Sequence, residues 1–147
     1  MTFYDTEGHM ERGDAIKKIY EWAECLEVDT EREHFKDVVE ELTLPVMKDR
    51  LDFDLEEEVF RYKLLSPIVK QDGSGSIEIL TIKETDMNEN KEIQRFKDNQ
   101  SIDQATALLS KACGIPVGFV SRIKQRDIGK INAVVLGFFA QTGSSRG

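Results

Sequence analysis

Residues 59–84 contain two apolar runs separated by a glycine-rich turn, and this stretch constrains the fold most strongly. The first run is rich in aromatic and branched residues. The second, residues 77–84, alternates between apolar and polar side chains except at Ile79. Runs of this kind predict β-strands. Between them, residues 72–76 supply glycines that can adopt positive φ, as a tight hairpin loop requires. The sequence therefore predicts a β-hairpin.

A proline lies inside the first of these strands, at the Ser66-Pro67 step. Because proline has no N–H to donate to a ladder, we expect this strand to lie at a sheet edge or to bend here. A two-stranded hairpin is not stable alone in water, so helical segments must cover its apolar face. Together these features predict an α+β fold, with a β-hairpin or small antiparallel sheet covered by several short α-helices.

Two amphipathic helices are predicted before the hairpin. In residues 14–27 apolar side chains recur at helical spacing, and Asp14 can serve as the N-cap. The second helix is predicted to begin at Thr30, where a threonine and a glutamate three residues later fit a capping box. Pro45 limits how far this helix continues. Their short connection favours a helical hairpin.

Four helical segments are predicted after the hairpin. They are a short polar helix within residues 85–100, a helix from Ser101 to Gly114, one or two turns within residues 117–123, and a last helix over residues 128–141. Gly114 suits the position just after a helix, and Pro116 prevents the helix from continuing. Asp127 is expected to cap the last helix.

Charge is distributed unevenly along the chain. Residues 1–58 carry 19 acidic and 7 basic side chains, whereas residues 59–147 carry 9 and 13, within an overall net charge of −8. We interpret the change near residue 58 as a domain boundary. An acidic helical hairpin and connector would occupy residues 1–58, and the core would occupy residues 59–141. The polar residues 142–147 are expected to be disordered.

Composition narrows the classes of function. A net-acidic chain without a basic-aromatic motif argues against nucleic acid as a ligand. No apolar run approaches the roughly 18 residues that span a membrane. The two cysteines, Cys25 and Cys113, stand far apart and indicate neither a disulfide framework nor a zinc site. We therefore expect a soluble, cytoplasmic protein that binds no cofactor.

No catalytic or metal-binding pattern is evident. The two histidines lie in the acidic N-terminal part without a Cys–His or Ser–His–Asp arrangement. The acid-rich residues 49–58 fail as a calcium loop, because a count from Asp52 places Glu57 at the glycine position and Lys63 at the bidentate glutamate position. Residues 72–76 lack the lysine and the helix of a phosphate-binding loop. The sequence therefore predicts that the protein is not an enzyme and holds no metal.

The last predicted helix carries small residues at every fourth position beside an apolar ridge. The small residues are Gly129, Ala133 and Gly137, and the neighbouring apolar residues include Val135, Phe138 and Phe139. A stripe of small side chains lets another helix approach closely. Two interpretations stay open: the stripe packs inside this domain, or it forms a groove that binds a partner helix. These six residues are the candidate partner-binding site.

Several segments follow one another in a fixed order between residues 60 and 140. They are Leu65-Ser-Pro-Ile68, Gly75 with the run Ile77-Glu-Ile-Leu-Thr-Ile-Lys-Glu84, Leu108-Leu-Ser-Lys-Ala-Cys-Gly-Ile-Pro116, and Asp127 followed by Ile131, Val135 and Phe138-Phe139. In this order they resemble the tail assembly chaperone family of tailed bacteriophages and prophages, particularly the small chaperones of contractile-tailed phages. The resemblance covers a little over half of the chain.

The resemblance implies a non-enzymatic function in the cytoplasm of a bacterial host. Such chaperones keep the tape measure protein, a long and aggregation-prone helical rod, soluble until the tail tube assembles around it. The implied partners are tape measure helices, tail tube subunits and further copies of the chain, with neither nucleic acid nor membrane. Two other classes stay open: a structural tail protein that remains in the virion, and a small enzyme that uses its clustered acids.

Overall fold

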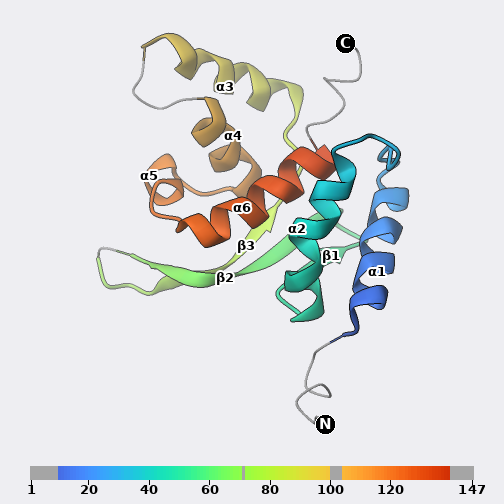
Figure 1. Cartoon of the computed structure of the whole chain (residues 1–147). Coiled ribbons are helices and arrows are strands. Elements are labelled where there is room, and N and C mark those ends of the chain that lie inside the picture. Colours follow the sequence, from blue (N-terminus) through green and yellow to red (C-terminus); the bar gives the residue numbers. More distant parts are fainter. Residues whose placement is uncertain (1–9, 71, 100–103, 140–147) are drawn as a thin grey trace.

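The computed structural model describes residues 10–70, 72–99 and 104–139, of which residues 94–99 are described by their backbone alone. It is an α+β fold in which helices cover a three-stranded antiparallel sheet (Figure 1), as predicted. In chain order the elements are α1 (Arg12–Cys25), α2 (Phe35–Met47), β1 (Leu51–Asp54), β2 (Val59–Val69), β3 (Ser76–Ile82), α3 (Met87–Asn99), α4 (Gln104–Cys113), α5 (Val117–Val120), α6 (Gln125–Val134) and the π-helical turn η2 (Val135–Phe139).

The predicted hairpin forms strands β2 and β3, and β2 is the central strand of the sheet. Gly73 and Gly75 in its loop have φ of 76° and 143°, so the turn uses glycine as predicted. β1 pairs with β2 only as far as Tyr62, so the half of β2 that contains Pro67 has a ladder on the β3 side alone. Within this half the register shifts, and Pro67 lies at this bulge.

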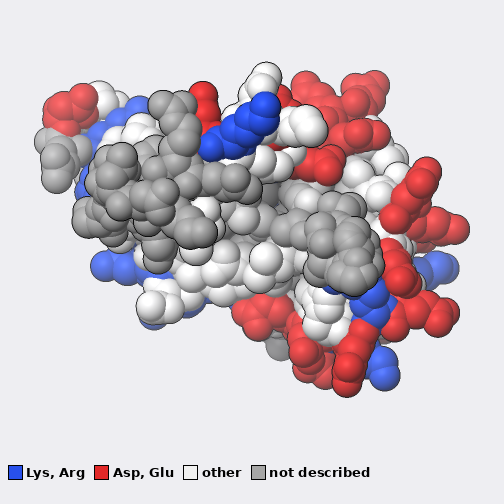
Figure 2. Space-filling model, turned by 90° about the horizontal axis from the view of Figure 1, so that it is seen from above, with Lys and Arg blue, Asp and Glu red and all other residues white. Residues whose placement is uncertain are grey.

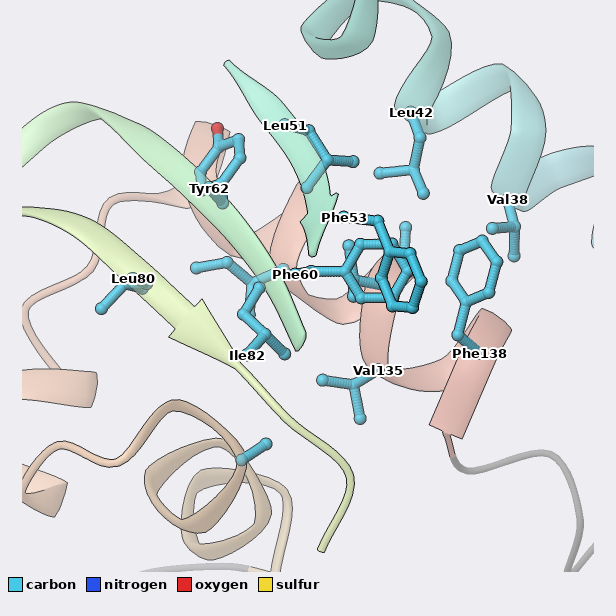
Figure 3. Close-up of a cluster of buried hydrophobic side chains, with 14 of the residues drawn as sticks. Val38, Leu42, Leu51, Phe53, Phe60, Tyr62, Leu80, Ile82, Val135 and Phe138 are labelled. Atoms are coloured by element: carbon cyan, nitrogen blue, oxygen red, sulfur yellow. The ribbon is translucent and has the colours of Figure 1, made fainter. Parts of the chain in front are cut away.

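A single apolar core joins the helices to the inner face of the sheet. The ring of Phe60 in β2 lies 4.7 Å from that of Phe53 in β1 and 4.8 Å from that of Phe138 in η2, measured between centroids (Figure 3). Trp22 of α1 meets Phe60 edge to face at 5.5 Å. Aromatic pairs in such geometries add to the free energy gained from burial. Elements from both ends of the chain therefore share one core.

The domain boundary expected at residue 58 is not found, and this prediction is corrected. The expected connector contains strand β1, which pairs with β2. In α1 and α2, Trp22, Phe35 and Val39 belong to the same buried cluster as the sheet. These side chains need an apolar surface, and the hairpin face supplies it. The acidic charge of residues 10–58 marks the solvent-facing sides of these helices, not a separate body. Residues 142–147 lie outside the described residues.

The helices begin at other residues than the capping patterns predicted. α1 begins at Arg12 and α2 at Phe35, and neither has a side-chain cap. Pro45 lies inside α2, which ends two residues later. α4 ends as predicted, with Gly114 at φ 67°. α6 begins at Gln125. Asp127, the predicted cap of this helix, is therefore a buried residue of its first turn. The capping box predicted at residues 101–104 lies largely outside the described residues.

Candidate functional site

The bulge in β2 is held by a carboxylate from α6. Asp127 is fully buried, and its two oxygens accept hydrogen bonds from the backbone N–H groups of Leu65 (2.9 Å) and Ser66 (3.0 Å) and from the hydroxyl of Tyr62 (2.6 Å). A bulge leaves N–H groups without ladder partners, and an unpaired buried N–H is costly. The carboxylate supplies the missing acceptors and so fixes the shape of the outer half of the hairpin.

The surroundings of the Tyr62 hydroxyl keep it neutral. Burial, and then the hydrogen bond to Asp127, raise the pKa of Tyr62, while the nearby charge of Arg50 acts in the opposite direction. The hydroxyl therefore stays protonated and donates. The carboxylate also lies in the first turn of α6, where the helix dipole stabilises negative charge. Three donors and the dipole together offset the cost of burying the charge.

Around the bulge, the hairpin presents large apolar side chains to solvent: Leu65 within it, Ile79 before it and Val69 beyond it. Leu65, Val69 and Ile79 are 45 %, 61 % and 56 % exposed. The tip of the hairpin projects past the helices (Figure 1). Val69 pairs with Ser76, and side chains alternate along β3, so Val69 and Ile79 lie on opposite faces of the hairpin. Single exposed apolar side chains are common, but several on one hairpin give a partner apolar contacts on both of its faces. We call these three residues the hairpin surface.

A hollow of about 410 Å³ lies along the outer side of β3, against the C-terminal end of α4. Its lining comprises Ile77, Ile79, Leu80, Thr81, Lys83, Ala112, Cys113, Gly114 and Ile115. The N–H of Lys83 donates to the carbonyl of Ala112 (2.8 Å), which fixes the end of the strand on the helix. Burial raises the pKa of the Cys113 thiol to about 12. At neutral pH this thiol is therefore an uncharged part of the lining.

The six residues predicted to bind a partner helix lie in or against the packed core. A Cβ on Gly137 would stand 2.6 Å from Cγ1 of Val38 in α2, and a Cβ on Gly129 would stand 3.2 Å from Oε2 of Glu41. Of the others, Ala133, Val135 and Phe138 are buried and Phe139 is partly buried. The groove is filled by α2 of the same chain. Of the two interpretations that the sequence left open, the groove for a partner helix is therefore corrected, and close packing inside the domain accounts for the stripe.

Sequence reasoning missed the role of Asp127, which it treated as a helix cap. The signal that could have found it is Pro67. A proline inside a strand marks a bulge or an edge, and a buried bulge needs an acceptor for its free N–H groups. An acidic residue at the start of a later helix is a suitable acceptor. The partner of a bulge cannot be assigned from spacing along the chain, however, because it comes from a distant segment.

The histidine and acid-rich segments that the sequence analysis rejected as sites are ordinary surface in the structure. His34, one of the two histidines, is exposed next to the start of α2. In the acid-rich segment, Asp54 and Arg61 form an ion pair at 2.8 Å, and the hydrogen bond from Arg61 lowers the pKa of Asp54. Among the described residues, no group of three or more His, Cys, Asp or Glu side chains could hold a metal ion. None of the described helices combines the length and apolar character needed to cross a membrane.

Acidic side chains gather over the part of the molecule that contains α1 and α2 (Figure 2).

Comparison with protein families, curated proteins and solved structures gave no match for this chain. The hairpin surface and the neighbouring hollow are therefore candidates on the strength of their geometry.

Proposed function

We propose that this protein is a non-enzymatic tail assembly chaperone, which keeps apolar segments of a tape measure protein soluble in the cytoplasm of a bacterial host. One observation carries the proposal: the hairpin surface of Leu65, Val69 and Ile79 is solvent-exposed. The same hairpin contains two of the segments that resemble this family, residues 65–68 and 77–84. The proposal thus moves the predicted partner contact from the last helix to the hairpin.

The chemistry of the surface fits a holding function. Burying apolar surface contributes about 25 cal/mol per Å², so three partly exposed side chains give a modest contact that can form and release repeatedly. A long rod offers many such contacts to many copies. The acidic side that Figure 2 shows over α1 and α2 would face water in such a coat. A net charge of −8 keeps coated partners apart and favours solubility.

Co-expression with a tape measure protein tests the proposal. The variant carries three substitutions, Leu65→Ser, Val69→Ser and Ile79→Ser. We expect it to fold and to leave the tape measure protein in the pellet, whereas the unchanged chain keeps it soluble. A matched control changes three exposed apolar residues elsewhere: Leu44→Ser, Leu55→Ser and Met87→Ser, which are 50 %, 65 % and 73 % exposed in the unchanged chain.

Equal rescue by the hairpin variant and the unchanged chain would reject the hairpin surface as the contact. Loss of rescue by the control alone would move the contact to another face. Adding tail tube subunits to the soluble complex should release the chaperone. Stoichiometric amounts of the chain in purified virions would instead support a structural tail protein.

A further inference from the structure

On part of the outer edge of β3, no described residue bonds to the backbone N–H and C=O groups. β3 is the last strand of the sheet, and its ladder runs only to β2. Opposite Ile79, Lys63 turns its N–H away from β3 and donates it to the carbonyl of Arg50 (2.8 Å). In an antiparallel sheet, both members of such a pair turn their backbone groups outward. The backbone N–H and C=O of Ile79 therefore point away from β2.

The backbone N–H and C=O of Thr81 point the same way, because in a strand these groups of every second residue point to the same side. Lys83, two residues after Thr81, fits this alternation, since its N–H donates outward to the carbonyl of Ala112. Among the described residues, no backbone group bonds to the outward N–H and C=O of Ile79 and Thr81. Both residues line the 410 Å³ hollow beside α4, so there is open space next to them. An open edge of this kind can add a further strand.

The charges around this edge favour a cationic occupant. Lys83 is paired with Glu89, and Lys111 of α4 is paired with Glu92. Two exposed acids of the strand and its end, Glu78 and Glu84, form no ion pair with any described residue. The C-terminal end of α4, which closes the hollow, is the negative end of a helix dipole. Lys63, opposite Ile79 on β2, is exposed and also forms no ion pair with a described residue. Two acids against this one lysine leave the unbalanced charge at the edge negative.

We propose that the outer edge of β3 binds an extended, basic segment of a partner protein, which adds to the sheet as a fourth strand beside Ile79 and Thr81. The inference rests on the proposed function only in assigning that segment to the protein being held. Backbone hydrogen bonds to these two residues would align the segment. Its alternate apolar side chains would contact Ile79 and the hollow, and its Lys or Arg residues would approach Glu78 and Glu84. A second copy of the chain is disfavoured, because it would bring like charges together.

A synthetic peptide tests this inference without the tape measure protein. The probe alternates valine and threonine and carries two lysines at each end. Isothermal titration against the full chain should show saturable binding that weakens as salt rises from 20 to 300 mM. The same peptide with N-methyl groups on one edge should bind about tenfold more weakly or not at all, since it loses those backbone donors. A version with glutamates in place of the lysines should also lose affinity.

Thr81→Pro is the matched change in the protein. Proline is tolerated at a strand edge whose N–H faces solvent, so the thermal midpoint should shift by no more than about 3 °C. Peptide affinity should nevertheless fall about tenfold, because the outward N–H is lost. Ile79→Thr keeps the backbone groups and should weaken binding by only a few-fold. If Thr81→Pro fails to fold, the N-methylated peptide tests the same bonds on the unchanged chain.

Equal binding of the plain and N-methylated peptides would overturn the proposed strand addition. Equal binding of the lysine and glutamate peptides would overturn the assignment of a basic segment. A dimer that Thr81→Pro dissociates would show that the edge is occupied by a second copy instead. Absence of peptide binding with intact tape measure rescue would reject the edge and leave the proposed function standing. Peptide binding without rescue would support strand addition at the edge and reject the proposed function.

Discussion

Two regions of the molecule use valine and glycine in opposite ways. The first is the contact between α2 and the last helix, and the second is the outer half of the hairpin. Val38, in the first region, is 6 % exposed, whereas Val69, in the second, is 61 % exposed. A Cβ on Gly137 would meet Val38 at 2.6 Å, whereas a Cβ on Gly73 would meet nothing within 4 Å. Position 137 requires glycine because Val38 leaves no space for a side chain there. Gly73 is needed for its φ of 76°.

The difference shows that an apolar or small residue acquires its role from the element opposite it. α6 and η2 lie against α2, so their small residues bring two helices of one chain together. The outer part of the hairpin extends beyond the helices (Figure 1), and Val69 there stays exposed. A groove that is filled by the same chain leaves no room for a partner, whereas a projecting strand can be reached by one.

Gly137→Leu should have the largest effect on stability. The added side chain would have to occupy the position of Val38, and overpacking of this kind costs about 3 kcal/mol at the upper end of its usual range. Urea unfolding followed by circular dichroism measures the loss. Leu136→Ala, at the exposed neighbour, is the control and should change stability by no more than about 0.5 kcal/mol. A Gly137→Leu variant as stable as the unchanged chain would mean that α2 does not fill the groove.

Asp127→Asn should rank second, because Asp127 links α6 to the hairpin. The amide keeps one acceptor and turns an NH₂ group toward the N–H groups of Leu65 or Ser66. Hydrogen bonds to a buried charge and the cost of leaving donors unpaired give a loss of about 2–3 kcal/mol. Tyr62→Phe removes one donor alone and should cost about 1 kcal/mol. Equal losses from the two changes would contradict the account of the bulge.

The sequence predicts the fold class and the hairpin because both rest on local patterns. Alternating side chains and the glycines at 73 and 75 specify two strands and their turn without reference to the rest of the chain. Helix starts were less well predicted. Thr30 had the local features of a capping box, but α2 begins at Phe35, where the aromatic ring enters the core. Core packing outweighed a capping preference of about 1 kcal/mol.

The third strand and the site could not be predicted, because both depend on contacts between distant segments. Residues 51–54 alternate, with buried Leu51 and Phe53, but four residues among many acids resemble a solvated connector. The small-residue stripe correctly indicated close helix packing, yet the sequence could not say whether α2 or a partner fills it. The open edge of β3 is likewise known only once the strand order is known.

Alkaline pH should reveal the contribution of Tyr62 at the junction of the two regions. Its pKa is raised in the folded state above its ordinary value of 10, so its contribution to stability is complete below pH 10 and is lost as the pH rises further. The slope for one such group is at most about 1.4 kcal/mol per pH unit. Urea unfolding at pH 9, 10 and 11 should show a smaller loss for Tyr62→Phe than for the unchanged chain. Parallel losses would contradict a raised pKa.

The last comparison makes one substitution in both regions, valine to threonine, and the smallest expected effect is the one at Val69. The change keeps the shape of the side chain and replaces a methyl group with a hydroxyl. At Val38 the hydroxyl would be buried, and Val38→Thr should cost about 1–2 kcal/mol of unfolding free energy. At Val69 the hydroxyl would meet water in a strand, where threonine is favoured, so Val69→Thr should change stability by no more than about 0.5 kcal/mol. Chemical denaturation of both variants under one set of conditions measures the difference directly. If the two changes cost the same, the hairpin residue is covered in solution, by a second copy or by the hairpin folding back, and the hairpin surface is not free to bind.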